Sequence, residues 1–552
     1  MTDTPEWNIA DVYEAIAAHV PDHPCQIQGD RVVTWGEFDR RASALAADLV
    51  AAGLGHQAKV ACYLHNGPEY LEVVVAAFKA ALVPVNTNYR YGADEIAYLF
   101  DNADAEAVVF HASFTDLLAG IRERLTKVAR WYVVADHTGP GPDWAVPYES
   151  VATSGAALEP GSRSRSGDDL LLLYTGGTTG MPKGVMWRQD DLFNVLGASG
   201  NAVAGVPPAT SLDEVFGRID TTLIDGRGAT TPVMVVACPL MHGTGQFSAL
   251  IAMTGGGAVV SLASRHFDVE ELFTTIEQRR ATNLVIVGQA FAGPMLEHLE
   301  AHPGRYDLSS LNVISSSGVM WSHDNKAGLL RHIPQVVLFD SFGSSEAVGL
   351  GGSVSAAGMA EQTATFAIGP NNAVFTDDDR RVEPGSGEMG MIAVGGFIPV
   401  GYYKDPEKSA RTFREIEGRR WSIPGDFATV NDDGTIHLLG RGSVCINTGG
   451  EKVFPEEVEE ALKTHPSVRD AVVVGLPDER FGETICAVVE AHGELPVDAN
   501  ELRGHVTSSL AAYKAPRSVV IVDSIARAAN GKVDYARLKQ VAADRLGPGN
   551  PS

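Results

Sequence analysis

The stretch Tyr174-Thr-Gly-Gly-Thr-Thr-Gly-Met-Pro-Lys-Gly-Val185 directly follows an apolar run, Leu170–Tyr174. Glycines let backbone N–H groups approach phosphate oxygens closely, while threonine and lysine add hydroxyl donors and positive charge. A solvent loop rich in Gly and Thr is the alternative. We interpret the stretch as a phosphate-binding loop, although not a Walker A loop, because Pro182 stands where that loop has Gly before the Lys. Its candidate phosphate contacts are Thr175, Gly176, Gly177, Thr178, Thr179 and Lys183.

Short apolar runs, separated by helical patterns, recur along the first part of the chain. Thr34 and Glu37, for example, form a capping box before a helix with Phe38 and Leu45 on one face. Strands buried on both faces give continuous apolar runs, as in parallel sheets covered by helices. The pattern therefore predicts an α/β fold with parallel sheets. The expected buried strands are Val60–Leu64, Val83–Val85, Leu170–Tyr174, Val233–Ala237, Val285–Val287, Val313–Ser315 and Val336–Phe339.

A candidate domain boundary lies at Gly440-Arg441-Gly442-Ser443, where the composition changes. We divide the chain there into residues 1–440, a large N-terminal domain of several subdomains, and residues 441–552, a small α+β domain. A helix is expected from Pro455, because proline is favoured in a first helical turn. The strands expected in the small domain are Ala471–Val474, Ile485–Val489 and Ser518–Val522.

The charge of the chain limits its partners. The 552 residues contain 43 Lys+Arg against 69 Asp+Glu, a net charge of −26. Such a surface repels nucleic acid and anionic membranes, so neither is an expected partner. It also repels ATP, coenzyme A and carboxylates. A site for those anions needs a local group of cations and backbone donors.

The N-terminus and the cysteines indicate the cytoplasm. No basic and apolar leader opens the chain, and Glu72 and Lys79 interrupt its most apolar stretch, Tyr70–Val85. The cysteines are scattered without metal-ligand spacing, which is typical of reduced thiols. We leave the oligomeric state open, with a homodimer as one possibility. The cysteines are Cys25, Cys62, Cys238, Cys445 and Cys486.

Four later segments join the phosphate loop in a recognisable order. They are Asp340-Ser-Phe-Gly-Ser-Ser-Glu346, Gly425-Asp426 followed by Gly440-Arg441, Gly449-Gly-Glu-Lys-Val-Phe-Pro-Glu-Glu-Val458, and Asn530-Gly-Lys532. With the loop, they resemble the signatures of the adenylate-forming superfamily of acyl-CoA synthetases, adenylation domains and luciferases. The ordered set spans nearly the whole chain. The resemblance implies a mobile C-terminal domain and an ATP-dependent acid–thiol ligase that forms an acyl-adenylate and then an acyl-CoA.

The second signature and the ribose segment imply nucleotide contacts. Glu346 would hold Mg²⁺, since a hard cation prefers carboxylate oxygen, and Asp426 would accept both ribose hydroxyls. The alternative for Glu346 is a surface or N-cap glutamate, whereas Asp426, taken alone, reads equally as a turn aspartate. Phe342 would stack on the base, Ser345 would donate to the α-phosphate and Arg441 would lie near the ribose. The other implied contacts are Ser316, Ser317, Gly318, Asp340, Ser341 and Gly343.

The remaining implied roles concern the two half-reactions. Lys532 would stabilise the charge that develops as pyrophosphate leaves, although a Gly-Lys pair is usually a solvated turn. His242 would shield the acyl site from coenzyme A as a gate, its alternative being a structural histidine. Gly449 and Gly450 would line the coenzyme A tunnel. The chain departs from the family at the hinge, where it reads Gly442-Ser443-Val444.

The residues of the expected pocket segments narrow the choice of acid substrate. No acidic residue lies between Cys238 and Ala252 to pair with a substrate ammonium, so an amino acid is disfavoured. Small residues in the segment 285–294 leave room for a bulky acyl group. Met186-Trp187-Arg188 and the segment 441–452 look most like the actinobacterial enzymes that activate fatty acids and steroid side-chain acids. A ligase that loads a carrier protein and a non-catalytic nucleotide-binding regulator remain the alternatives.

The resemblance predicts that Lys532→Ala abolishes adenylation and leaves the attack of coenzyme A on supplied acyl-AMP largely intact. The two half-reactions are measured separately, by pyrophosphate release and by thioester formation. An equal loss of both steps would remove the assigned role.

Overall fold

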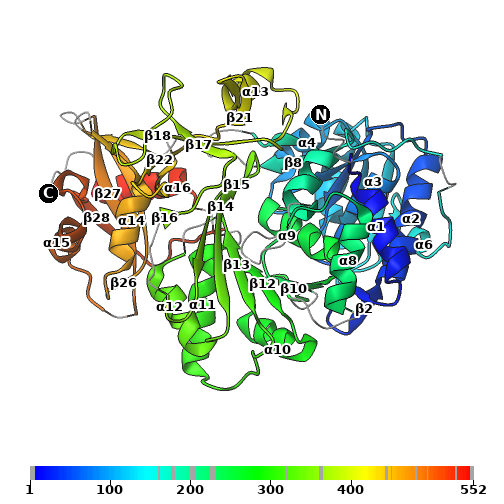
Figure 1. Cartoon of the computed structure of the whole chain (residues 1–552), viewed down its shortest axis with the longest axis horizontal. Helices are drawn as coiled ribbons and strands as arrows, with labels where there is room; N and C mark the ends of the chain where they lie inside the picture. Colours follow the sequence, from blue (N-terminus) through cyan, green and yellow to red (C-terminus); the bar gives the residue numbers. More distant parts are fainter. Residues whose placement is uncertain are drawn as a thin grey trace.

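The computed structural model of the chain describes residues 6–158, 162–175, 181–198, 207–223, 232–318, 321–359, 365–441, 445–448, 451–478, 482–493, 495–528, 531 and 533–547. Figure 1 shows the N-terminal half (blue to cyan) at one end, a sheet coloured green in the middle and the C-terminal domain (orange to red) at the other end. Three sheets build the N-terminal part, and a fourth belongs to the C-terminal domain.

The first sheet carries the phosphate hairpin. Its eight strands run in the order β19-β9-β8-β4-β3-β5-β6-β7. The strands β3 to β8 are parallel neighbours, and β9 turns back antiparallel to β8. Their bounds are β3 (Lys59–Tyr63), β4 (Val83–Asn86), β5 (Ala105–His111), β6 (Arg130–Val134), β7 (Val146–Pro147), β8 (Leu170–Thr175), β9 (Lys183–Arg188) and β19 (Gly401–Tyr402).

The second sheet also has eight strands, in the order β15-β14-β13-β12-β10-β11-β1-β2. The strands β14, β13, β12, β10, β11 and β1 are parallel neighbours in this sheet order, as the apolar runs predict. The run expected to end at Phe339 continues to Ser344, because β14 gains an antiparallel partner in β15. The bounds are β1 (Pro24–Gln28), β2 (Arg31–Thr34), β10 (Val233–Val236), β11 (Ala258–Ser261), β12 (Asn283–Ile286), β13 (Val313–Ser317), β14 (Val337–Ser344) and β15 (Ala347–Ser355).

The chain next forms a third sheet, before it enters the C-terminal domain. The described strand pairs of this sheet are antiparallel. Its order is β16-β23-β22-β18-β21-β20, with β17 paired to β18. The bounds are β16 (Thr365–Phe366), β17 (Asn372–Phe375), β18 (Met389–Gly395), β20 (Phe413–Ile416), β21 (Arg419–Ser422), β22 (Asp426–Val430) and β23 (Ile436–Arg441), with the helix α13 (Pro406–Thr412) before β20.

Helices cover the two large sheets and bury their apolar faces. Thr34 caps the first long one as predicted, accepting the Glu37 N–H at 3.2 Å. Among the described residues, no helix is both long and apolar enough to cross a membrane. The helices are α1 (Ile9–His19), α2 (Trp35–Ala51), α3 (Pro68–Lys79), α4 (Ala93–Asn102), η1 (Ala112–Phe114), α5 (Thr115–Ile121), η2 (Arg122–Arg124), α6 (Tyr148–Ala152), α7 (Gln189–Phe193), η3 (Asn194–Ala198), α8 (Leu212–Leu223), α9 (Gly243–Thr254), α10 (Val269–Arg279), α11 (Gly288–Ala301) and α12 (His323–His332).

The C-terminal part forms a separate α+β unit with apolar clusters on both faces of its sheet. Together with the sheets above, it confirms the predicted fold class, and the three strands expected here are present. The boundary at 440/441 stays a prediction, and Arg441 still belongs to β23, paired with Asp426. The elements are β24 (Ile446–Thr448), β25 (Glu451–Val453), α14 (Pro455–Lys463), β26 (Val468–Asp478), β27 (Gly482–Ala491), α15 (Ala499–Ser509), η5 (Ala512–Lys514), β28 (Ser518–Val522) and α16 (Tyr535–Leu546).

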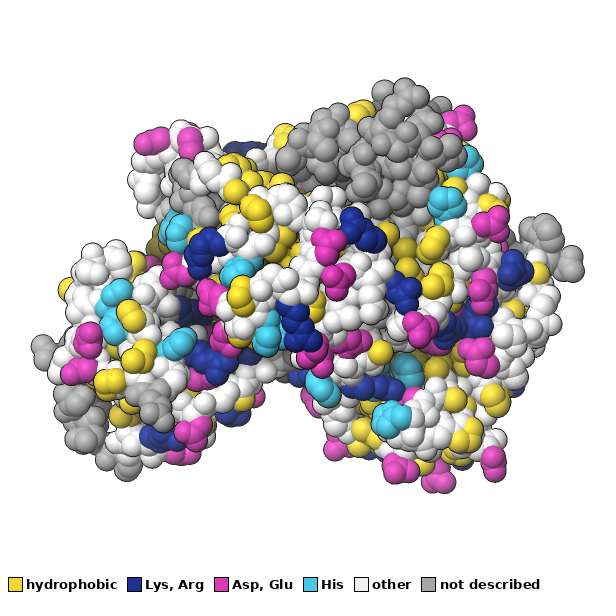
Figure 2. Space-filling view, turned by 90° about the horizontal axis from the view of Figure 1, so that it is seen from below, with side chains coloured by type: hydrophobic (Ala, Val, Ile, Leu, Met, Phe, Trp, Pro, Cys, Tyr) yellow, Lys and Arg dark blue, Asp and Glu magenta, His cyan; other side chains and the backbone are white. Residues whose placement is uncertain are grey.

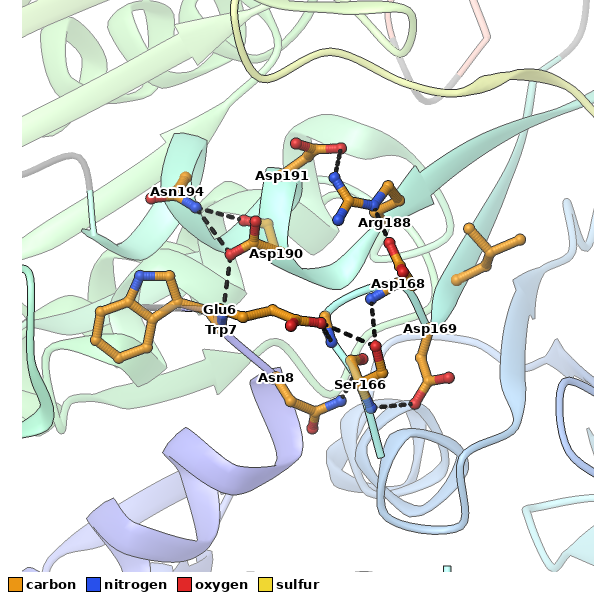
Figure 3. A network of polar contacts seen from close by, with 12 residues as sticks. Glu6, Trp7, Asn8, Ser166, Asp168, Asp169, Arg188, Asp190, Asp191 and Asn194 are labelled. Carbon is orange, nitrogen blue, oxygen red and sulfur yellow. Dashed lines mark hydrogen bonds and ion pairs between the residues drawn. The ribbon is translucent and has the colours of Figure 1, made fainter. Parts of the chain in front are cut away.

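The N-terminal segment is pinned to the open end of the β8–β9 hairpin (Figure 3). The Trp7 N–H donates to Asp190 at 2.9 Å, and the Glu6 carboxylate accepts the Gly167 N–H at 2.7 Å. A methyl group on Gly167 would lie 2.6 Å from the Glu6 side chain and 2.8 Å from the Asp190 Cβ. The hairpin that ends in the phosphate loop is therefore clamped at its base.

Gly167→Ala is expected to lower the free energy of unfolding by about 1–3 kcal/mol, since the added methyl group overpacks this contact. Gly120→Ala is the matched control, because Gly120 lies in α5 and a Cβ added there would meet no atom within 4 Å. That substitution is expected to be neutral or stabilising in chemical denaturation. Equal stability of the two variants would contradict the clamp.

Candidate active site

The phosphate-loop residues that the structure describes lie at the tip of the β8–β9 hairpin. Thr175 and Lys183 face each other as its last paired residues, so Lys183 begins a strand and does not lie within the loop. Gly184 is required next to it, because a Cβ there would lie 2.7 Å from the Tyr174 ring. Gly176, Gly177, Thr178 and Thr179 lie outside the described residues.

The second signature lies where β14 passes the end of β13. Ser316 and Ser317 pair with Asp340 and Ser341, so these residues share the carboxyl edge of the parallel strands, where ligands bind in open α/β sheets. The buried Ser316 hydroxyl already accepts the Gly288 N–H at 2.8 Å and thereby fixes the start of α11.

Asp340 forms a buried ion pair. The Lys326 ammonium lies 3.0 Å from its carboxylate and 5.6 Å from the Trp321 ring centroid. Burial raises the pKa of Asp340, and Lys326 partly opposes that rise. The carboxylate thus has a protein partner and anchors β14 to α12; its predicted nucleotide contact stays a prediction.

Glu346, the expected metal ligand, lies at a junction of three sheets. The Tyr402 hydroxyl donates to Glu346 Oε1 at 2.7 Å, and the Ser422 hydroxyl donates to the Glu346 carbonyl at 2.6 Å. Trp187 on β9 donates its indole N–H to the Ser345 carbonyl at 3.0 Å. Glu346 is 9% exposed. The first, second and third sheets therefore converge on this one segment.

The donor set fits a magnesium nucleotide. Glu346 offers a second carboxylate oxygen beside the one held by Tyr402. Among the described residues, no group of three or more His, Cys, Asp or Glu side chains could hold a metal. Mg²⁺ suits such a site, because it commonly takes one or two carboxylates and completes its shell with phosphate oxygens and water. Lys183, the cation expected for the phosphates, begins β9, the strand that pairs with Tyr402.

The ribose and base residues come from the third sheet and the end of β14. Asp426, buried at the start of β22, is paired with Arg441 on β23. The Phe342 ring packs 5.7 Å from the Phe366 ring. Gly318 has a φ of +91° and little around it, with no atom closer than 3.7 Å to a Cβ at that position. These positions leave the expected adenosine contacts as predictions.

His242 ends a tight turn and caps α9 through its backbone. Two buried or half-buried asparagines hold this turn: the Asn86 amide donates to the Met241 carbonyl at 2.6 Å and to the Tyr174 carbonyl at 2.9 Å. Asn66 accepts the Leu240 N–H at 2.7 Å. Asn86 thus ties the turn that carries His242 to the strand that leads into the phosphate loop.

A cavity of about 990 Å³ lies between the C-terminal domain and the large sheets. Tyr89 and Pro239, from the first and second sheets' loops, line it together with Arg527 and Ala528 of the C-terminal domain. Figure 2 shows cationic, acidic and histidine side chains together along the groove between the C-terminal domain, on the left, and the rest of the chain. Its mixed charge favours a polar, elongated ligand over a bare hydrocarbon.

Arg527 supports the segment that leads to Lys532. Its guanidinium binds both carboxylate oxygens of Asp470, at 2.6 and 2.8 Å, and donates to the Gly531 carbonyl at 3.2 Å. Burial raises the pKa of Asp470, but Arg527 and Lys463 outweigh it, so the net pKa is lowered. Lys532, Gly449 and Gly450 themselves lie outside the described residues.

The positioning contacts could not be seen in sequence. Tyr402, Asn86 and Arg527 belong to no motif that sequence reasoning singled out. Tyr402 lies 56 residues from its partner Glu346, and Asn86 lies 155 residues from Met241. A Gly-Tyr-Tyr run followed by Asp-Pro was the available signal for Tyr402, and it reads as an ordinary turn before a helix.

Comparison with solved structures agrees with this fold. The structure resembles the anthranilate CoA ligase AuaEII in complex with anthranoyl-AMP, with a TM-score of 0.82, 20% identity and 98% of both chains covered. It also resembles ATP-bound MatB from Rhodopseudomonas palustris, with a TM-score of 0.77, 24% identity, and 98% of this chain and 100% of that chain covered. At these identities the likeness shows the fold alone.

Sequence relatives are closer. The chain is 39% identical to the medium-chain acyl-CoA ligase Mig of Mycobacterium avium, over 99% of this chain and 100% of that protein. It is 40% identical to the 3-oxocholest-4-en-26-oate–CoA ligase of Rhodococcus rhodochrous, over 96% of this chain and 94% of that protein. Residues 13–403 match the AMP-binding enzyme family, and residues 457–532 match the AMP-binding enzyme C-terminal domain. The predicted resemblance is confirmed, and the chain belongs to the AMP-binding enzyme family.

Proposed function

We propose that this protein is an ATP-dependent acid–thiol ligase that converts a medium- or long-chain fatty acid or a steroid side-chain acid into its coenzyme A thioester. The observation that carries the proposal is the junction at Ser345–Glu346. There, hydrogen bonds connect the strand after the phosphate loop, the Glu346 carboxylate that we expect to bind the metal, and the third sheet. Relatives with about 39–40% identity are named as ligases for such acids.

In the first half-reaction, a carboxylate oxygen attacks the α-phosphorus, and the P–O bond to pyrophosphate breaks. Two anions must meet, so charge neutralisation is the main requirement. Lys183 and Glu346-bound Mg²⁺ would neutralise the phosphates, with Ser345 donating to the α-phosphate. Asp426 would orient the ribose, and Lys532 would stabilise the charge that builds up on the reacting oxygens.

In the second half-reaction, the thiolate sulfur of coenzyme A attacks the acyl carbonyl carbon, and the C–O bond to AMP breaks. The cavity beside Pro239 offers a route for the extended thiol arm, since it reaches the turn that carries His242. We assign His242 as the gate between this route and the acyl site. Gly449 and Gly450 would line the route after the C-terminal domain rotates.

The acyl group would lie against α11, whose first turns carry Gly288, Ala290 and Gly293. Small side chains there leave volume for a long or ring-containing acid. We place the enzyme in the cytoplasm, where ATP and coenzyme A are available, with the acid, ATP and coenzyme A as its partners.

A panel of acids tests the proposal directly. With ATP, Mg²⁺ and coenzyme A, medium- and long-chain fatty acids or a steroid side-chain acid are expected to give pyrophosphate, AMP and a thioester detectable by mass spectrometry. An amino acid is the negative control. Pyrophosphate release without any thioester would favour a carrier-loading ligase, and no release with any acid would favour a nucleotide-binding regulator.

Arg527→Gln tests the support of the lysine segment. The substitution removes the bidentate partner of Asp470 and a donor to Gly531, so adenylation is expected to slow about 10- to 100-fold. Thioester formation from supplied acyl-AMP should slow less than adenylation does, because only the first half-reaction needs Lys532, whereas Arg527 is one of many residues that line the proposed coenzyme A route.

Arg503→Gln is the matched control for that variant, since Arg503 lies in the same domain and bonds the backbone carbonyls of Pro516 and Arg517 at 3.0 and 2.6 Å. It is expected to leave adenylation unchanged. Equal slowing of both half-reactions by Arg527→Gln would show a general structural role.

A further inference from the structure

One short segment holds two oppositely charged groups of the proposed site. Gly401–Asp405, here called the 401–405 arm, includes β19 and the turn that leads into α13. Its strand pairs with β9 through Gly401↔Met186 and Tyr402↔Val185, and the Tyr403 N–H donates to the Gly184 carbonyl at 2.8 Å. The arm is therefore fixed to the strand that begins with Lys183.

At one end of the arm, Tyr402 holds Glu346. Tyr402 is 3% exposed, and its hydroxyl donates to Glu346 Oε1 at 2.7 Å. Because water cannot readily replace a donor at this depth, Glu346 Oε1 would lose its hydrogen bond without the hydroxyl. The bond also selects one orientation of the carboxylate and leaves its other oxygen outside this contact.

At the other end, Asp405 uses its two oxygens for two tasks. Oδ1 accepts the Lys408 N–H at 3.0 Å and caps α13, while Oδ2 pairs with the Lys183 ammonium. The hydrogen bond from Lys183 lowers the pKa of Asp405. The side chains of Lys183 and Asp405 are 37% and 25% exposed, so the pair is weak enough for a polyphosphate to displace.

The arm is anchored independently of these two contacts. Lys404 and the Tyr403 hydroxyl both bind Asp104, each at 2.7 Å. Asp104 lies just after the end of helix α4 in the chain. The Ser409 hydroxyl accepts the Tyr402 N–H at 2.8 Å. Both working side chains thus project from a backbone that the rest of the fold holds in place.

We propose that Tyr402 and Asp405 are positioning residues that hold Glu346 and Lys183, respectively, until Mg²⁺ and ATP arrive. Tyr402 orients the Glu346 carboxylate for the metal. Asp405 occupies Lys183 in the nucleotide-free protein and yields it to the triphosphate. The proposal rests on the function proposed above and adds two residues to it.

The two residues are expected to act in opposite directions on ATP binding, measured by calorimetry with ATP and MgCl₂ in the absence of acid. Asp405→Asn keeps an oxygen that can cap α13 but removes the carboxylate charge that pairs with Lys183, so ATP should bind about two- to fivefold more tightly. Tyr402→Phe should raise the Mg²⁺ concentration needed for half-maximal ATP binding about three- to thirtyfold.

Variants of the two partners show whether Asp405 acts through Lys183 and Tyr402 through Glu346. In a Lys183→Met background, Asp405→Asn should no longer change ATP affinity, and in a Glu346→Gln background Tyr402→Phe should no longer change the Mg²⁺ requirement. Asp268→Asn is the control for capping, since Asp268 caps α10 in the same way by accepting the Glu271 N–H. It should leave ATP binding unchanged. Thermal unfolding, measured on every variant, checks that each one is folded.

Two results would overturn the proposal. If Lys183→Met and Glu346→Gln weaken ATP binding but Asp405→Asn and Tyr402→Phe behave like Asp268→Asn, the proposed function stands and the positioning roles fall. If Lys183→Met and Glu346→Gln leave ATP binding unchanged, the nucleotide roles proposed for both residues fall as well.

Discussion

The bonds that converge on Ser345 and Glu346 are the constraint on which the site depends. Trp187 reaches this segment from the first sheet, Ser422 from the third, and the segment itself follows β14 of the second. A buried polar segment is tolerated only when its groups are paired, so the three sheets cannot shift independently without leaving a carbonyl or a carboxylate unsatisfied. Glu346, the proposed metal ligand, is thereby held where the three sheets meet.

The same logic places the other candidate groups. The parallel strands bring Ser316 and Asp340 to one edge of the second sheet. Asn86 bonds both Met241, in the turn after β10, and Tyr174 of the β8–β9 hairpin, and so links the second sheet to that hairpin. The C-terminal domain closes the arrangement from outside. Gly440 lies beside the Glu456 carboxylate of α14 and has a φ of +127°, a backbone conformation that other residues rarely adopt. Local sequence chemistry supplies the groups, and long-range polar contacts set the distances between them.

Sequence reasoning predicted the parts of the fold that depend on local pattern. The apolar runs Leu170–Tyr174 and Val313–Ser315 are strands, and Pro455 begins a helix, because burial on both faces and helix-start chemistry are visible within a few residues. It missed the extension of β14 to Ser344, since that depends on an antiparallel partner. It also missed Tyr402 and Asp405, whose importance arises only from contacts; Asp405 lies 222 residues from Lys183.

A structure determined with Mg²⁺ and a non-hydrolysable ATP analogue tests the central claim most directly, namely that the junction at Glu346 and the β8–β9 hairpin form one nucleotide site. The account predicts a metal within about 2.0–2.1 Å of a Glu346 carboxylate oxygen and the Lys183 ammonium moved from Asp405 to a phosphate oxygen. A nucleotide bound elsewhere, or bound with Lys183 still paired to Asp405 and Glu346 free of metal, would contradict it.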